Sequence, residues 1–240
     1  MIYKRIPIIG QQINVITFKQ VMEEIKKVLG TRKTVLIIPM NLHNIIELTK
    51  SKQVVELLQL DTSIAIADGV PLVFLSKFNN KQLPERISGT DLVEEILSIK
   101  ETKVFVISSN KSIGTKIMQK YSSVVDFWVA PIYKNAIPFE KNLMKRIGRI
   151  KPNVLIVALG CPTQEKWIQI HWEMIKDINV IISAGSALEL ITGEKLRAPQ
   201  FLRDNGFEWL WRIILEPRRL APRYIKDCFE IIKRLRYLRN

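Results

Sequence analysis

The sequence predicts an α/β fold with a mainly parallel sheet, flanking helices and a helical C-terminal appendage. Short apolar runs such as Val154 to Leu159 show no polar alternation, which is typical of strands buried on both faces of a parallel sheet. Such runs alternate with stretches of helical spacing, and the turns between them are short. The composition changes after Arg197-Ala198-Pro199, so we divide the chain into an α/β core, residues 1–194, and an appendage, residues 195–240.

Each element follows from its own pattern of apolar residues. Thr17 is expected to be the N-cap of the first helix, and Thr163 opens a helix directly after the run that ends at Leu159. Residues 127–133 are read as a short strand or a loop. The expected strands are 34–38, 63–67, 103–108, 154–159 and 179–183, and the expected helices cover 17–29, a stretch from about 42, 89–97, 112–121, 138–150 and a stretch from 163.

Composition excludes several classes of protein. The chain has 240 residues, of which 47% are hydrophobic, and this is enough for one substantial core. Two distant cysteines, Cys161 and Cys228, argue against a disulfide scaffold and fit a reducing cytoplasm, and two histidines are too few for a histidine-based metal cage. We expect neither a signal peptide nor a transmembrane helix.

The net charge of +14 implies an anionic partner, and half of it lies in the appendage, where 12 Lys and Arg face 5 Asp and Glu (+7). Aromatic residues interleave with these basic ones. That pattern is typical of helices that lie in an anionic membrane interface. A helical hairpin packed on the core, with its charges solvated, is the alternative. Nucleic-acid binding has no recognised motif here.

Polar residues directly after predicted strands are the candidate site residues, because ligands of open α/β sheets bind at the carboxyl ends of the strands. Asp68 follows such a run, where partial desolvation favours a general base, although it also suits a turn cap. Asn41 suits a helix cap or a ligand, and Thr90 and Asp91 suit helix caps or sugar contacts. At Gly160 a strand turns into a helix. This turn is either a phosphate-binding site, formed by the free N–H groups of the helix start, or an ordinary strand–helix connection.

Four segments together resemble the WecG/TagA/CpsF glycosyltransferases, glycosyltransferase family 26. The resemblance covers about Val15 to Tyr224, and its most specific segment is Leu159-Gly160-Cys161-Pro162-Thr163-Gln164-Glu165-Lys166-Trp167. The other three are Ala67-Asp68-Gly69-Val70-Pro71-Leu72-Val73, Glu85-Arg86-Ile87-Ser88-Gly89-Thr90-Asp91-Leu92, and the stretch from Arg197-Ala198-Pro199 through Gly206-Phe207-Glu208-Trp209-Leu210-Trp211-Arg212 to Glu216-Pro217-Arg218-Arg219-Leu220.

The resemblance implies a Rossmann-like fold of the GT-E type and an inverting transfer without an essential metal or other cofactor. The donor would be a UDP-sugar carrying N-acetylmannosamine or a related hexose. The acceptor would be a polyprenyl-diphosphate-linked saccharide of teichoic acid or another surface polysaccharide, reached from the cytoplasmic face of the membrane by a peripheral protein. No nucleic-acid partner is implied, and a homo-oligomer stays open.

Residue by residue, the resemblance makes Asp68 the general base and places Gln164 and Glu165 near the nucleotide. It brings the appendage to the diphosphate through Arg212, Arg218, Arg219 and Arg223. Together with the residues at strand ends, the predicted substrate-binding set is Asn41, Thr90, Asp91, Gly160, Gln164, Glu165, Arg212, Arg218, Arg219 and Arg223.

The chain departs from the family pattern at two strand ends. Pro39-Met40-Asn41 replaces a common Thr-x-Asn, which removes a hydroxyl, and Ser108-Ser109-Asn110 stands where a glycine pair is common. A nucleotide-sugar epimerase or dehydrogenase is a weaker alternative, because no glycine-rich dinucleotide turn is present. The remaining alternative is a non-catalytic basic α/β protein that binds membrane or nucleic acid.

Overall fold

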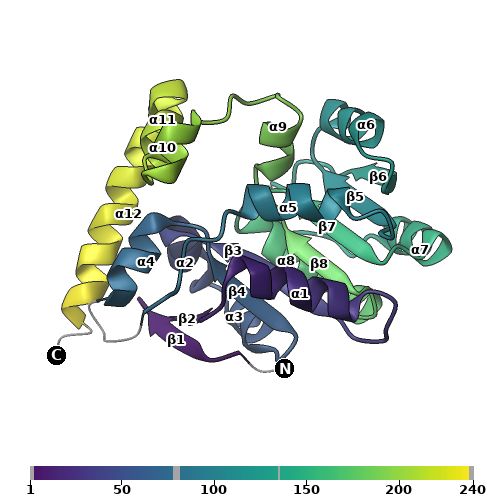
Figure 1. Ribbon diagram of the computed structural model, residues 1–240, viewed down its shortest axis with the longest axis horizontal. Helices are drawn as coiled ribbons and strands as arrows, with labels where there is room; N and C mark the ends of the chain where they lie inside the picture. Colours follow the sequence, from purple (N-terminus) through teal and green to yellow (C-terminus); the bar gives the residue numbers. More distant parts are fainter. Residues whose placement is uncertain (1–2, 78–81, 135, 238–240) are drawn as a thin grey trace.

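A six-stranded parallel sheet forms the centre of the molecule, as the computed structural model shows for residues 3–77, 82–134 and 136–237 (Figure 1). Its strand order is β4-β3-β8-β7-β5-β6. Five of the six strands bury every residue, as their uninterrupted apolar runs predict, and only the edge strand β6 is partly exposed. The strands are β3 (Val35–Met40), β4 (Ser63–Ala67), β5 (Val104–Ser108), β6 (Val124–Val129), β7 (Val154–Ala158) and β8 (Val180–Ser183).

Helices cover both faces of the sheet, and each face has its own hydrophobic cluster. One cluster joins the sheet to α1 (Phe18–Val28), α5 (Gly89–Ser98), α6 (Lys111–Lys120) and α9 (Ala187–Ile191). The other cluster joins the opposite face to α2 (Leu42–Leu48), α3 (Lys52–Gln59), α4 (Val70–Lys77), α7 (Lys141–Ile150) and α8 (Thr163–Ile175). This confirms the predicted α/β architecture.

Local capping explains where several helices begin. Thr17 accepts a hydrogen bond from the backbone N–H of Gln20 and forms the predicted N-cap of α1. For α5 the cap is Ser88, which accepts from the N–H of Asp91, so Thr90 and Asp91 lie inside the first turn instead of capping it. The observed cap lies two residues before Thr90 and three before Asp91, which leaves both side chains free for other contacts.

Three features differ from the sequence prediction. An antiparallel hairpin, β1 (Arg5–Ile8) and β2 (Gln11–Asn14), was not expected, because its turn at Ile9 and Gly10 lacks the usual Asn-Gly signal. Helices α3, α4 and α9 were also not assigned. Strand β3 continues through Pro39, where the missing N–H is tolerated because β3 pairs with β8 only as far as Ile37.

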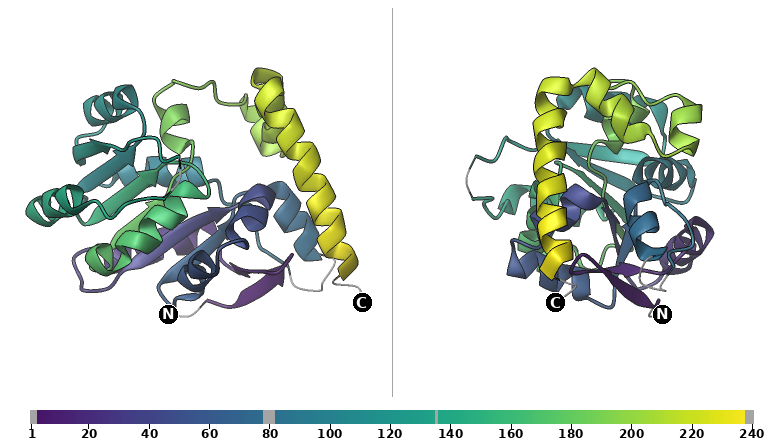
Figure 2. Two further views of the ribbon diagram at one scale, coloured as in Figure 1. Left: turned by 180° about the vertical axis from the view of Figure 1, so that it is seen from behind. Right: turned by 90° about the vertical axis from the view of Figure 1, so that its left-hand side faces the viewer.

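The described part of the appendage, residues 195–237, is helical and stands at one end of the sheet (Figures 1 and 2). Its helices are α10 (Gln200–Asp204), α11 (Glu208–Leu215) and α12 (Pro217–Tyr237), and α12 packs against α2. Residues 238–240 of the predicted appendage lie outside the described residues. None of the helices that the structure describes is both long enough and apolar enough to span a bilayer.

Candidate active site

A cleft of about 590 Å³ lies between the sheet and the appendage. Its floor is built from residues at the carboxyl ends of β3, β4, β5, β7 and β8, and its far wall comes from α11 and α12. This is the edge where parallel α/β sheets bind ligands, because strand ends and helix starts converge there. The cleft therefore combines groups on a rigid sheet with groups on a separate helical segment.

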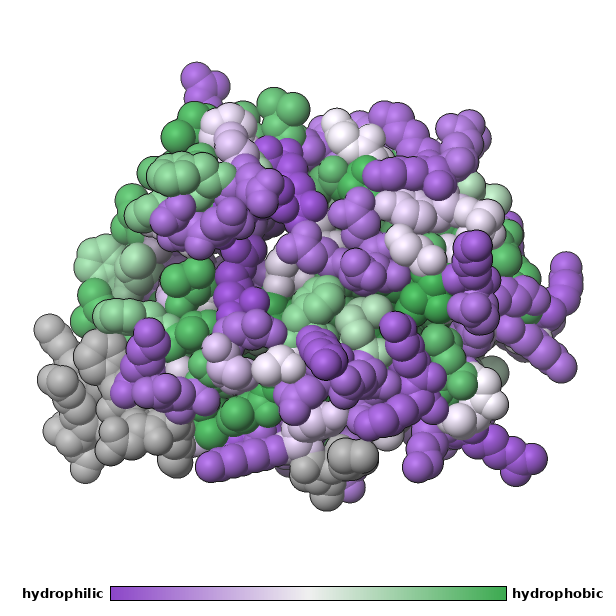
Figure 3. All heavy atoms as spheres, viewed as in Figure 1, coloured by the Kyte–Doolittle hydropathy of each residue, from purple (hydrophilic) through white to green (hydrophobic). Residues whose placement is uncertain are grey.

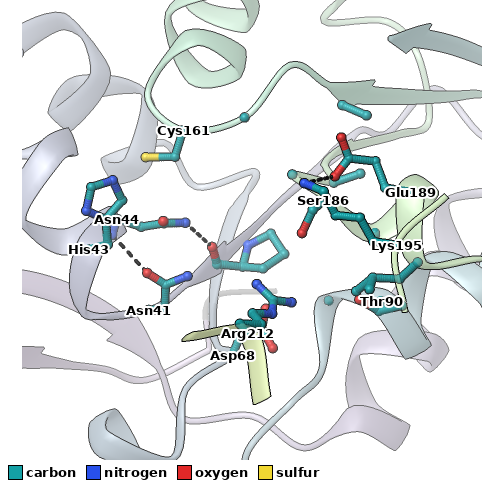
Figure 4. Close-up of a pocket in the computed structure, with 18 of the residues that line it drawn as sticks. Asn41, His43, Asn44, Asp68, Thr90, Cys161, Ser186, Glu189, Lys195 and Arg212 are labelled. Carbon is teal, nitrogen blue, oxygen red and sulfur yellow. Dashed lines mark hydrogen bonds and ion pairs between the residues drawn. The ribbon is translucent and has the colours of Figure 1, made fainter. Parts of the chain in front are cut away.

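Asp68 follows the last residue of β4 and lies beside Arg212 in the cleft (Figure 4). Its side chain keeps 28% of its surface exposed, so a ligand in the cleft can reach it. Desolvation raises the pKa of Asp68 to about 6, although Arg86 and Arg212 act in the opposite direction. The carboxylate is therefore more basic than an ordinary aspartate, and this suits proton abstraction near neutral pH.

An ion-pair network ties this carboxylate to the appendage. Arg86 Nη2 lies 3.9 Å from Asp68 Oδ1 and donates to Glu208 Oε2 at 2.7 Å. Glu208 Oε1 also accepts from Arg212 Nη2 at 2.9 Å. Burial alone would raise the pKa of Glu208, but Arg212 and Arg86 outweigh burial and lower it. Glu208 therefore stays charged and holds one arginine of each region beside Asp68.

Glycine and asparagine residues shape the same part of the cleft. A Cβ atom at Gly89 would lie 2.9 Å from Pro39 Cγ and 3.3 Å from Asp68 Oδ2, so only glycine lets α5 begin this close to the carboxylate. Asn41 lines the cleft and also caps α2, since its Oδ1 accepts from the N–H of Asn44 at 3.0 Å. Thr90 lines the cleft from the first turn of α5.

The turn between β7 and α8 forms part of the floor. Gly160 has φ +76°, and α8 begins without a side-chain cap. Gln164 lines the cleft, accepts from the backbone N–H of Gly185 at 2.9 Å and donates to Glu165 Oε1 at 2.8 Å. The bond to Gly185 joins the ends of β7 and β8, and the two bonds together fix the orientation of the Gln164 amide.

Glu165 is fully buried beneath Gln164 and does not line the cleft. Its Oε2 has no hydrogen-bond partner among the described residues. Desolvation raises the pKa of Glu165 to about 7, and hydrogen bonding from Gln164 moderates the rise. The structure thus places the predicted nucleotide contact one layer below the cleft, where it supports Gln164.

The appendage supplies three of its four predicted arginines to the cleft. Arg212, Arg219 and Arg223 line the wall opposite the sheet. Arg219 is paired with Glu216, whereas Arg223 Nε has no hydrogen-bond partner among the described residues. Planar guanidinium groups on one wall are suited to the oxygens of a diphosphate.

Two further predicted residues do not line the cleft. Arg218 is exposed and lies outside the cleft, because it precedes Arg219 by one position and therefore lies about 100° away around α12. Asp91 forms an ion pair with Arg197, where the chain enters the appendage. Asp91 thus fastens the appendage to α5.

Sequence reasoning missed several residues that line the cleft. Ser186 and Glu189 follow β8, and the rule that singled out Asp68 would have identified them at this strand end. Lys195, at the start of the appendage, pairs with Glu189 at 2.6 Å. His43 lines the cleft two residues after Asn41 and contacts Asp227 of α12, a pairing across 184 positions that leaves no trace in the sequence.

A metal centre is not formed by the described side chains: within residues 3–77, 82–134 and 136–237, no group of three or more His, Cys, Asp or Glu residues is placed to hold a metal ion.

Comparison with known proteins finds N-acetylmannosaminyltransferases that are similar to this chain. It is 27% identical over 227 residues to the N-acetylglucosaminyldiphosphoundecaprenol N-acetyl-beta-D-mannosaminyltransferase of Staphylococcus aureus strain MRSA252, covering 90% of this chain and 87% of that protein. It is 29% identical over 162 residues to the Bacillus subtilis strain 168 enzyme of the same name, covering 66% and 63% respectively. The model of the glycosyl transferase WecG/TagA/CpsF family matches residues 6–240, and the chain therefore belongs to this family of glycosyltransferases.

Proposed function

We propose that this protein transfers a sugar, N-acetylmannosamine or a related hexose, from a UDP-sugar to a polyprenyl-diphosphate-linked saccharide with inversion at the anomeric carbon. The observation that carries the proposal is the cleft itself: the carboxylate of Asp68, with its pKa raised to about 6, lies in the same cleft as three arginines of the appendage. Its relatives in Staphylococcus aureus and Bacillus subtilis are named for transfer of N-acetylmannosamine to a diphosphoundecaprenol-linked N-acetylglucosamine, which supports the transferred sugar and the acceptor class of the proposal.

Asp68 acts on the acceptor. Its carboxylate takes the proton of the acceptor hydroxyl, and the resulting oxygen attacks the anomeric carbon of the donor from the side opposite UDP. The new carbon–oxygen bond forms as the bond to the diphosphate breaks, and the electron pair leaves with UDP. A single displacement of this kind inverts the configuration.

The arginines act on the leaving group. Negative charge grows on the diphosphate as the bond breaks, and Arg212, Arg219 and Arg223 face that charge from the appendage wall. The uncapped start of α8 after Gly160 adds the positive end of a helix dipole on the floor. These fixed charges supply the stabilisation that a divalent metal provides in many other glycosyltransferases, so the proposal includes a metal-independent reaction.

The appendage also docks on the membrane that carries the acceptor, as part of this proposal. Its exposed apolar side chains follow α10 to α12, and hydrophobic surface appears along that side of the molecule in Figure 3. Exposed basic residues, among them Arg218 and Lys226, accompany them. Apolar and cationic groups together favour an anionic bilayer surface. We place this surface at the cytoplasmic face, where UDP-sugars are available.

The test is an assay of UDP release. The protein is incubated in EDTA with a panel of UDP-sugars and a short-chain lipid diphosphate that carries a mono- or disaccharide. We expect release that requires both substrates, identifies the donor and disappears in Asp68→Asn, which should still bind UDP. Absence of both release and UDP binding would contradict the proposal and favour a non-catalytic binding protein. Release that stops in EDTA and returns with a divalent cation would overturn its metal-independent part.

A further inference from the structure

A buried contact between α2 and α12 lies immediately behind the cleft. Both oxygens of Asp227 face His43 Nδ1, at 3.0 and 3.2 Å. Carboxylate oxygens only accept hydrogen bonds, so Nδ1 is the donor. Asp227 is 6% exposed, and His43 lies two residues after Asn41 on the cleft floor. The contact therefore joins the sheet edge to the middle of α12.

The same carboxylate faces a cleft arginine. Arg223 Nε lies 3.9 Å from Asp227 Oδ2, one helical turn earlier on α12. This nitrogen has no hydrogen-bond partner among the described residues, although it is buried. Arg223 lines the cleft, but Asp227 does not. Any effect of Asp227 on a bound ligand must therefore pass through its neighbours.

Because the Asp227 carboxylate is shared between His43 and Arg223, the charge of Arg223 is only partly neutralised. A direct, bidentate Asp–Arg pair would occupy the guanidinium donors and cancel most of their charge. Here His43 takes the hydrogen bonds, and Arg223 is left with a longer electrostatic contact. The guanidinium is held in place, yet its donors stay available for an anion in the cleft.

We propose that Asp227, held by His43, is a positioning residue that aims Arg223 at the diphosphate of the donor. This inference rests on the proposed function, which assigns Arg223 to the diphosphate. It adds that affinity for the nucleotide depends on a residue outside the cleft. It also explains why a carboxylate is buried in the mainly basic α12, where an uncompensated charge would be costly.

A second contact between the same helices provides a matched control. Arg234 Nη2 donates to Thr49 Oγ1 at 2.8 Å, and neither residue lines the cleft. Thr49→Val removes the acceptor and loosens the docking of α12 on α2 without touching Arg223. If Asp227 only fastened α12 to the core, Asp227→Asn and Thr49→Val would have the same effect on UDP binding.

The experiment measures the dissociation constant for UDP and the KM for the donor in the full chain, beside the thermal unfolding midpoint. We expect Asp227→Asn to weaken UDP binding about tenfold, as the loss of one charge-assisted contact predicts, with a matching rise in KM and little change in kcat. Thr49→Val should lower the unfolding midpoint by a similar amount and leave UDP binding unchanged.

Substitutions at His43 keep the test decisive if Asp227→Asn does not fold. His43→Ala frees the carboxylate to pair directly with Arg223 and should weaken UDP binding. His43→Asn keeps an N–H donor near the position of Nδ1. Unlike His43→Ala, it should therefore bind UDP nearly as tightly as the wild type does.

Three outcomes separate the inference from the proposed function. The first outcome is that Arg223→Met weakens UDP binding but Asp227→Asn does not. The inference is then wrong, and the proposed role of Arg223 stands. If Asp227→Asn is unfolded, His43→Ala takes its place in this comparison. Equal losses in Asp227→Asn and Thr49→Val would reduce Asp227 to a docking contact. If Arg223→Met binds UDP as the wild type does, the assignment of Arg223 to the diphosphate fails, and the inference fails with it.

Discussion

Strand β7 buries all of its side chains, whereas helices α10 and α11 bury none. The core is stabilised by apolar surface on both faces of the sheet, and each fully buried aliphatic side chain contributes about 1.5–3 kcal/mol. Polar pairs join the appendage to the core, Arg86 with Glu208, His43 with Asp227, and Arg234 with Thr49, and α12 buries few apolar side chains, such as Leu220 and Ile231. The two regions therefore differ in what holds them.

The difference matters because the chemistry is divided in the same way. The proposed base, Asp68, lies on the sheet, where the surrounding structure is closely packed. The cations proposed to face the leaving group lie on the appendage. Regions held by few buried apolar contacts open at lower free energy than a core does. We infer that the position of Asp68 is fixed by the packed core. The position of the arginines instead depends on the polar contacts that hold the appendage.

The largest expected effect concerns the core carboxylate. Asp68→Asn removes the base, and general bases contribute about 10²–10⁴-fold to rate, so transfer should fall by that factor while UDP binding persists. In the wild type, kcat/KM should rise with pH through about 6, because desolvation raises the pKa of Asp68 and only the deprotonated carboxylate accepts a proton. UDP release across pH 4.5–8 measures both. A profile without a rise near pH 6 would remove Asp68 from this role.

The second effect tests stability within the core. Desolvation raises the pKa of Glu165 to about 7, from about 4.5 for an ordinary glutamate. The group's contribution to stability is therefore complete below about pH 4.5 and is lost as pH rises through about 7. The loss amounts to about 3 kcal/mol at 1.4 kcal/mol for each pH unit. Glu165→Gln does not titrate, so its stability relative to wild type should increase by about 2.5 kcal/mol between pH 5 and 8.

Chemical denaturation at the two pH values measures this change. Asp68 titrates in both proteins, so its contribution cancels in the difference. A stability difference that is independent of pH would mean that Glu165 is ionised in the folded protein throughout, and that the unpartnered Oε2 has a compensating contact in solution.

The sequence predicts where a strand ends more reliably than it predicts the direction in which a helix side chain points. Uninterrupted apolar runs predicted the sheet and, with it, the position of Asp68 at a strand end, because that position depends only on where the run stops. Glu165 was predicted to contact the nucleotide together with Gln164. Consecutive residues of a helix point about 100° apart, and this rotation buries Glu165 while Gln164 lines the cleft.

Contacts between distant segments were beyond sequence reasoning for a different reason. The His43–Asp227 pair depends on how α12 crosses α2, and nothing local encodes that crossing. For the appendage, two interpretations were left open, a membrane-facing helix and a hairpin packed on the core. The structure shows packing through Ile231 together with exposed apolar residues such as Phe229, so one amphipathic helix carries features of both.

The third effect tests how the appendage is held. Glu208→Gln removes the charge that joins Arg86 to Arg212, and hydrogen bonds to charged groups contribute about 1.5–3 kcal/mol. We expect faster amide hydrogen exchange in α11 and α12, with exchange in β7 unchanged.

Asp126→Asn is the matched control for this experiment, because it breaks a comparably close ion pair with Arg146 at the edge of the core. It should leave exchange in the appendage as it is. Uniform acceleration of exchange throughout the sheet in Glu208→Gln would show that the appendage and the core unfold as one unit.

The smallest effect tests what the exposed face of the appendage contacts. Phe229 is 71% exposed, and Ile225 and Ile232 lie on the same side of α12 at helical spacing. Phe229→Ser should weaken binding to vesicles containing anionic lipid about tenfold, which corresponds to burial of part of one aromatic side chain. Met174 is an exposed residue of α8, in the α/β region of the chain. Met174→Ser should bind vesicles as the wild type does.

Sedimentation of the protein with vesicles of phosphatidylglycerol and phosphatidylcholine, at low and high salt, measures this binding. Binding that weakens with salt but not in Phe229→Ser would assign membrane attachment to the basic residues alone, since salt screens charges without affecting apolar burial. Equal losses of vesicle binding in Phe229→Ser and Met174→Ser would mean that the protein does not bind the membrane specifically through the appendage. Loss in Phe229→Ser alone would give the two regions separate tasks, with the core carrying the base and the appendage bringing it to the lipid-linked acceptor.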